Sequence, residues 1–263
     1  GYPVIPKGPN QRSACFVLED LFNHWLPRHA LHSRWCYAEN VTAAGKNFGM
    51  NLLLGRSIDS PTTDAEEQQI ADVGEMMYNS FGASACVVQG AGDDQSEAIK
   101  KDFGVFVDLL VDHFDKHDFL LGNRACLADF ALVGPFKAHF LLDPEPKAWL
   151  GDNLALFEGY VARVWQAAKA DAHWLAEDEL PDTIHPIFNY AQRTYQQFAA
   201  SSIGAAQRGD KFFDLDVGYG PFTARSMKRL EKARLHVREE LLSCAAQESS
   251  IHRTGILDYY LAG

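Results

Sequence analysis

Several residues near the amino end are of types that ligate metal ions. They are three histidines and two carboxylates: His24, His29, His32, Glu19 and Asp20. Imidazole and carboxylate groups bind zinc and iron, so a metal site is one interpretation. Pro27 interrupts the helix that would align the histidines, and the spacing from His24 to His29 places them on different faces. We therefore favour packed or solvated histidines and predict no metal.

The cysteines of this chain do not form a recognisable disulfide or zinc pattern. They are five, widely spaced, and without a Cys-x-x-Cys pair: Cys15, Cys36, Cys86, Cys126 and Cys244. An odd number of scattered cysteines predicts free thiols and a reducing compartment, such as the cytoplasm or an organelle interior. A nucleophilic cysteine would need exposure and a nearby base. Cys15 and Cys126 lie in apolar stretches, which favours buried, unreactive thiols.

Charge and composition limit the classes of partner. The 263 residues are 47% hydrophobic and 22% charged, with a formal net charge of −11. This acidic balance argues against binding to nucleic acids or anionic membranes. No apolar run is long enough for a transmembrane segment, which predicts a soluble protein. The chain begins at Gly1 rather than Met, which indicates that a leader was removed or that a longer protein was cut.

One segment predicts the start of a buried helix. Cys126 stands three residues ahead of Asp129, where an aspartate can accept the free backbone N–H at the helix cap. The residues that follow, about Leu127 to Leu142, are apolar nearly all round. We therefore predict that this helix is the buried centre of a larger bundle, with Cys126 and Asp129 as its structural cap.

The periodicity of apolar residues predicts an all-α chain. Residues 1–12, rich in proline and glycine, are expected to form an extended arm. Helices are expected from Ser13, with a break near Pro27, and over the following ranges: 41–54, 64–81, 96–117, 127–142, 154–168, 184–206 and 223–246. Glycine-rich residues 82–94 are expected to be loop or a short strand, and 212–222 irregular. We expect a helical domain over 13–170 and a helical extension over 171–263 packed on the same bundle.

Three stretches resemble the helical carboxy-terminal domain of glutathione transferases. The first carries the apolar, glycine and capping positions of that family's helix-start motif, at Phe119, Leu120, Gly122, Leu127, Ala128 and Asp129. Cys126 departs from the motif, because a thiol is a weaker acceptor than the usual hydroxyl and would weaken the cap by about 1 kcal/mol. The second, from Leu18 to Arg28 and on to Trp35, is similar to a bacterial-type subgroup, as is the turn from Glu177 to Thr183.

The resemblance lacks half of what the family needs for catalysis. Glutathione transferases carry a thioredoxin-like domain ahead of these helices, and that domain binds and activates glutathione. The few residues ahead of Ser13 cannot form such a domain. The resemblance therefore implies no cofactor for this chain, and glutathione only where another segment or chain supplies the thioredoxin-like domain.

The same resemblance implies a ligand pocket on the first helices. In the family this face turns toward the cleft between the domains, and it would present Arg34, Trp35 and Tyr37 here, together with Phe106 from a later helix. A cationic group beside aromatic rings could hold an anionic, hydrophobic ligand. The alternative, which we favour, is that Arg34 pairs with an acidic neighbour such as Asp20 and that Trp35 is core.

Two functions follow from these observations. The first is a non-catalytic binding or assembly module, a subunit of a larger complex, whose partners are other protein subunits or a second copy of the chain. The second is the back half of a glutathione transferase.

The last helix is also basic, with Arg225, Lys228, Arg229 and Lys232 among its charges, and is either a solvated face or a docking surface for an acidic partner.

Overall fold

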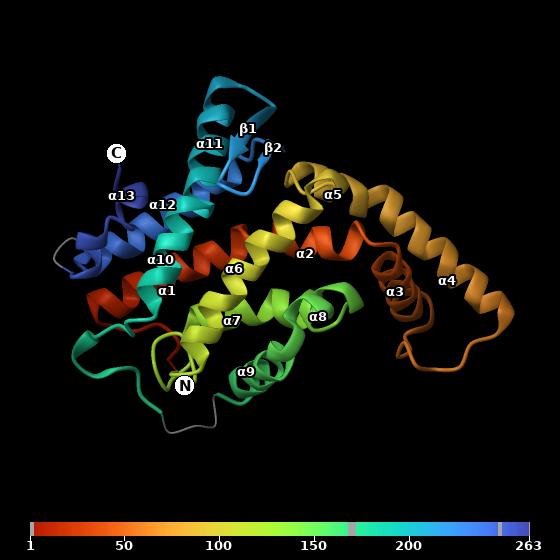
Figure 1. The fold of residues 1–263 in the computed structure, drawn as a ribbon, viewed down its shortest axis with the longest axis horizontal. Helices are drawn as coiled ribbons and strands as arrows, with labels where there is room; N and C mark the ends of the chain where they lie inside the picture. Colours follow the sequence, from red (N-terminus) through yellow and green to blue (C-terminus); the bar gives the residue numbers. More distant parts are fainter. Residues whose placement is uncertain (1–2, 168–171, 247–248, 263) are drawn as a thin grey trace.

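The computed structural model describes residues 3–167, 172–246 and 249–262, and within them the chain is mostly helical (Figure 1). The longer helices are α1 (Pro9–His24), α2 (Leu26–Trp35), α3 (Ala38–Gly49), α4 (Asp64–Met77), α6 (Ser96–Phe114), α7 (Leu127–Pro135), α9 (Leu154–Gln166), α10 (Ile184–Arg193), α11 (Tyr195–Arg208) and α12 (Arg229–Ser243). The short helices are α5 (Ala83–Val88), α8 (Pro144–Leu150) and α13 (Asp258–Leu261). Two strands, β1 (Phe212–Asp216) and β2 (Pro221–Arg225), form an antiparallel hairpin.

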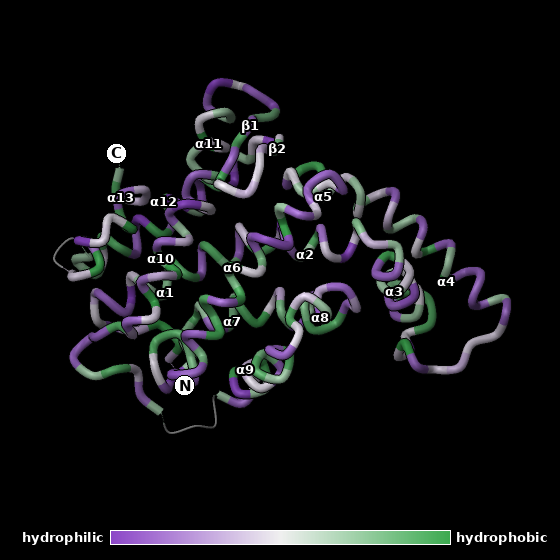
Figure 2. Tube along the Cα trace, viewed as in Figure 1, coloured by the Kyte–Doolittle hydropathy of each residue, from purple (hydrophilic) through white to green (hydrophobic). Residues whose placement is uncertain are grey.

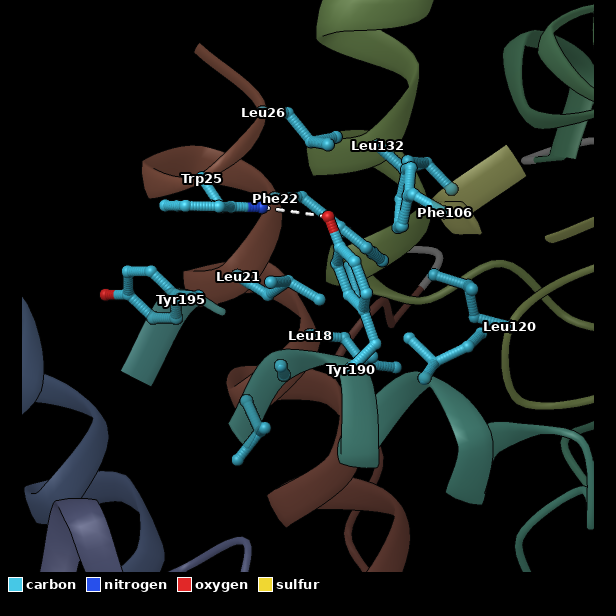
Figure 3. Packing of buried hydrophobic residues seen from close by; sticks show 14 of the residues in the cluster. Leu18, Leu21, Phe22, Trp25, Leu26, Phe106, Leu120, Leu132, Tyr190 and Tyr195 are labelled. Atoms are coloured by element: carbon cyan, nitrogen blue, oxygen red, sulfur yellow. Dashed lines mark hydrogen bonds between the residues drawn. The ribbon is translucent and has the colours of Figure 1, made fainter. Parts of the chain in front are cut away.

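Helix α1 runs through the middle of the bundle. It packs against α7 on one side and α12 on the other, and α10 packs against α6. Aromatic side chains fill the space between them, with Trp25, Phe106 and Tyr190 fully buried (Figure 3). Residues from both ends of the chain therefore share one hydrophobic core.

The amino end of α7 contains the contact predicted from the sequence. The Asp129 carboxylate accepts the backbone N–H of Cys126 at 2.8 Å and that of Leu120 at 3.0 Å. It also accepts the hydroxyl of Tyr160 at 2.9 Å. Burial raises the pKa of Asp129, while these donors oppose the rise. One carboxylate thus joins the helix cap to the preceding turn and to α9.

Helix α7 does not continue as a regular α-helix to Leu142. After Pro135 it passes into a π-helical segment, η4 (Phe136–Phe140), because proline has no N–H to donate to the preceding turn. Phe136 and Phe140 are fully buried, whereas Phe130 is 39% exposed. The helix is therefore buried along most of its length but not all round.

Three further ranges differ from the sequence prediction. Helix α1 begins at Pro9 rather than Ser13, because the distant carboxylate of Asp178 accepts the N–H groups of Asn10 and Gln11 at 2.7 and 3.0 Å. The range 82–94 contains α5, which extends α4 through a π-helical segment, η2 (Tyr78–Gly82). The range 184–206 is two helices, which meet at Thr194. The expected boundary at 170/171 lies outside the described residues.

The hairpin is a larger correction, because the sequence was expected to be all-α. Phe213, Phe222 and Ala224 are buried on one face of the hairpin and pack toward α11. In the turn, the Asp216 side chain accepts the N–H groups of Gly218 and Gly220 at 2.7 and 3.2 Å. Both glycines have positive φ, a conformation that other residues rarely adopt. The chain is mostly helical, with one small hairpin.

We predict that Asp129→Ala lowers the free energy of unfolding by about 3 kcal/mol or more, because three buried donors lose their acceptor. Urea unfolding followed by circular dichroism measures this change. The matched control is Asp112→Ala on the exposed side of α6, which should change stability by less than about 0.5 kcal/mol. Equal effects of the two substitutions would contradict the role assigned to Asp129.

A buried histidine predicts acid sensitivity. Burial lowers the pKa of His113 to about 4, and its ring bonds Thr183 at 2.8 Å. Since the unfolded value is about 6.5, the neutral ring stabilises the fold fully above that pH. This contribution is lost as the pH falls from about 6.5 toward 4, at up to about 1.4 kcal/mol per pH unit. Urea titrations at several pH values measure how the free energy of unfolding depends on pH. Between pH 6.5 and 4, His113→Gln should reduce this slope by the equivalent of about one proton. An unchanged slope would contradict the role assigned to His113.

Candidate functional site

Five of the eleven large hydrophobic side chains that are exposed in the described residues lie on an arm that projects from the bundle. The arm, residues 38–88, consists of α3, a π-helical segment η1 (Met50–Leu54), α4, η2 and α5, and it extends to the right of the bundle (Figure 1). Leu52 is 65% exposed, Leu53 47% and Met76 54%. Leu52 and Leu53 lie in η1, which follows α3, and Met76 lies near the end of α4. The trace that follows α3 is coloured hydrophobic in Figure 2.

The arm has little core of its own. Its hydrophobic cluster consists of Trp35, Ala44 and Cys86 with a few half-buried neighbours, separate from the core of the bundle. Helices α3 and α4 instead approach at glycines. A Cβ added at Gly45 would lie 2.9 Å from the Cα of Gly74, closer than real side chains approach a backbone. The two helices therefore pack backbone to backbone, with little side-chain burial between them.

A groove runs along this crossing. Its volume is about 480 Å³. The residues that line it come from both helices and the segments beside them: Val41, Thr42, Gly45, Lys46, Thr62, Glu67, Ile70, Ala71, Gly74, Glu75 and Tyr78. The small residues and Ile70 make an apolar floor, and Lys46, Glu67 and Glu75 make a charged rim. Such a groove suits an apolar side chain or a helix face.

The arm is strongly acidic. Residues 38–88 carry seven aspartates and glutamates but only two cations, Lys46 and Arg56. Arg56 is itself paired with Glu66. The backbone N–H of Thr63 donates to Glu66 at 2.8 Å, which lowers the pKa of that carboxyl group and starts α4 with a capping box. The surface around the groove therefore carries a net negative charge at neutral pH.

The structure places Arg34 away from any ligand role. Its guanidinium lies against both oxygens of Asp143, at 2.9 and 3.1 Å, and also donates to the carbonyl of Ala138. Asp143 is a distant residue, and neither Glu19 nor Asp20 is the partner of Arg34. Burial raises the pKa of Asp143, and the arginine opposes the rise. Arg34 thus fixes α2 to the segment after η4.

The other three residues predicted to bind a ligand do not share one pocket. Trp35 is buried in the small cluster of the arm and stacks on Phe48. Tyr37 is half-buried at the start of α3, with its ring edge against Trp149. Phe106 lies in the core of the bundle and contacts Phe22. The resemblance to glutathione transferases predicted one shared pocket for these residues, whereas in the fold each side chain packs in a different place.

Each histidine near the amino end has a separate hydrogen-bond partner. His24 pairs with Asp20 at 2.9 Å, His29 with Asp102 at 2.8 Å, and His32 with the carbonyl of Ala91 at 3.0 Å. Among the residues that the structure describes, no group of three His, Cys, Asp or Glu side chains is placed to hold a metal. These histidines connect α1 and α2 to their neighbours.

The predicted cap cysteine is inaccessible. Cys126 and Cys15 are both fully buried, and burial raises the pKa of the Cys126 thiol well above its usual value. A protonated, buried thiol is a poor nucleophile. Neither residue is placed to react with a ligand from solvent.

A second hollow lies beside α9. It has a volume of about 740 Å³ and is bounded by Asp118, Arg163 and Trp174 among others. Asp118 and Arg163 form a long ion pair at 3.8 Å. This hollow borders residues outside the described range, whereas the groove of the arm is complete within it. The arm is therefore the better defined site.

Comparison of the chain with protein-family models, with curated proteins and with solved structures gave no match. In the described parts of the chain, no helix has the length and apolar character needed to cross a bilayer. The groove was not predicted from the sequence. Gly45 and Gly49 recur at four-residue spacing on α3, where Gly45 faces Gly74 and Gly49 faces Ile70, and this spacing was the available signal.

We predict that Arg34→Met lowers the free energy of unfolding by about 3 kcal/mol, because Asp143 is left charged and buried without its partner. Urea unfolding measures the loss. The double variant with Asp143→Leu should recover most of it, since no unpaired charge remains. A double variant as unstable as Arg34→Met alone would contradict the pairing, and unchanged stability of the single variant would return Arg34 to the list of ligand-binding candidates.

Proposed function

We propose that this chain is a non-catalytic assembly module whose arm docks onto a different protein. The observation that supports this function is the exposed apolar surface of the arm, which comprises the groove between α3 and α4 and, apart from the residues that line the groove, the exposed side chains of Leu52 and Leu53. Full burial of an exposed leucine side chain contributes about 1.5–3 kcal/mol, and these two, at 65% and 47% exposed, would gain part of that against a partner. An apolar surface that the chain does not cover itself is typical of a protein–protein interface.

The charge of the arm favours one kind of partner. A symmetric pair of arms would bring the same acidic surface against itself, with seven carboxylates on each side. A partner that presents an apolar helix flanked by lysine or arginine would instead fill the groove and neutralise its rim. We therefore propose a basic, amphipathic segment of another protein as the occupant.

The resemblance to the helical domain of glutathione transferases is compatible with this proposal. A helical domain of that kind without its thioredoxin-like partner domain would act through its surfaces. The buried positions of Arg34, Trp35 and Phe106 support a structural role for residues that would otherwise shape a substrate pocket. The alternative function, the back half of a glutathione transferase, predicts a heavier natural chain that binds glutathione.

We predict that Leu52→Asp with Leu53→Asp abolishes assembly without unfolding the chain, because both side chains are exposed in the structure. The protein, carrying a photo-crosslinker at Thr42 beside the groove, is expressed in its source and isolated, and the mass of its particle is measured. We expect one stoichiometric partner cross-linked through a basic, apolar segment, and an affinity that falls as salt rises. The double variant should run as the free chain.

The matched control is Leu235→Asp with Leu242→Asp, which changes two exposed leucines on α12 and should leave the particle intact. Three outcomes would contradict the proposal: a free monomer, a particle of identical chains cross-linked arm to arm, or a cross-link that persists in the Leu52 and Leu53 variant. A chain heavier by a thioredoxin-sized domain that binds glutathione would support the transferase alternative instead.

A further inference from the structure

Two cysteines meet where the arm joins the bundle. Cys36 is the residue that ends α2, immediately before the arm, and Cys86 lies in α5 at the other end of the arm. Their sulfur atoms are 3.9 Å apart, although the residues are 50 positions apart in the sequence. Cys86 is buried and Cys36 is partly exposed, so solvent reaches the pair through Cys36. We call this pair the dithiol.

A histidine lies beside the dithiol. His32 precedes Cys36 by one helical turn, and both side chains donate to the carbonyl of Ala91, at 3.0 Å from Nδ1 and 3.5 Å from Sγ. A carbonyl only accepts, so Nδ1 carries the hydrogen and Nε2 carries a lone pair. Nε2 is buried and has no hydrogen-bond partner within the described residues. This nitrogen therefore makes no hydrogen bond to Cys36, and the hydrogen-bearing Nδ1 is the ring nitrogen at the shared carbonyl.

Cys36 must lose its proton before it can react. The hydrogen bond to Cys86 and burial raise the pKa of the Cys36 thiol, and the His32 imidazole acts in the opposite direction. The thiolate is the nucleophile in thiol–disulfide exchange, so a protonated Cys36 would react slowly without a proton acceptor. His32 is the neighbouring group that favours the thiolate.

We propose that Cys36, Cys86 and His32 form an oxidation site for low-molecular-weight disulfides. Cys36 loses its proton to water, and its thiolate attacks one sulfur of the disulfide, which releases one thiolate and leaves a mixed disulfide on Cys36. Cys86 then attacks the Cys36 sulfur and releases the second thiolate. Two protein thiols become one internal disulfide, and the small disulfide becomes two thiols, with the two protons passing to the products.

The internal disulfide would connect the two ends of the arm. Tyr37 to Ala85, almost the whole arm, would lie inside the closed loop, and Trp35 already packs over Gly82 at the same junction. Closing a loop of this length restricts the unfolded chain and holds the base of the arm. This inference does not depend on which partner binds the arm.

The experiment treats the full-length chain with oxidised glutathione and maps its peptides without reduction. We expect a Cys36–Cys86 disulfide in the wild type, and a stable glutathione adduct on Cys36 in Cys86→Ser. In the Cys86→Ser background, His32→Gln should slow adduct formation about tenfold or more. The oxidised wild type should melt about 5 °C or more above the reduced protein, with slower hydrogen exchange in α3 and α4.

Cys244→Ser is the matched control, because Cys244 is also partly exposed but lies beside Ser13 rather than another thiol. This variant should form the disulfide as the wild type does. Adducts that accumulate on Cys36 of the wild type without bridging would overturn the proposal, as would faster reaction at Cys244 than at Cys36. A rate unchanged by His32→Gln in folded protein would remove the histidine from the site.

Discussion

The fold depends on buried carboxylates that accept hydrogen bonds from tyrosine hydroxyls on distant helices. Asp102 accepts Tyr190 at 2.8 Å, and Asp129 accepts Tyr160 at 2.9 Å. The hydroxyls of Tyr195 and Tyr260 both donate to Asp20, at 2.8 and 2.9 Å. Burial raises the pKa of each of these tyrosines, so the hydroxyls remain donors. A buried carboxylate without such donors would be costly, so these pairs select one arrangement of the helices.

The arm is built on a different principle. Its two long helices approach at Gly45 and Gly74, and its apolar side chains at Leu52 and Leu53 face water rather than a core. Backbone contact brings the helices together but buries little apolar area, so the arm has stability to gain from a partner. The bundle has an extensive core of its own, although it too exposes large hydrophobic side chains such as Trp165 and Leu242. This difference supports a division between a self-sufficient scaffold and a surface that needs an occupant.

The junction between these two parts concentrates polar and sulfur chemistry. Arg34 and Asp143 fix the end of α2 to the bundle, while Cys36 and Cys86 lie at the two ends of the arm. A chemical change at this junction would act on the attachment of the arm and leave the core of the bundle unaltered. The same short stretch of α2 therefore carries both the structural ion pair and the proposed oxidation site.

Local features of the sequence determined the helical character of the chain, the break near Pro27 and the contact of Asp129 with the start of α7, since each depends on neighbouring residues. Only the tertiary structure decided the remaining pairings. Arg34 pairs with Asp143 across 109 positions and Cys36 contacts Cys86 across 50, and Asp178 accepts a backbone N–H at the start of α1 from 168 positions away. Short strands such as β1 and β2, and a groove between two helices, form only when separate elements pack together. The periodicity of residues along a single element therefore could not predict them.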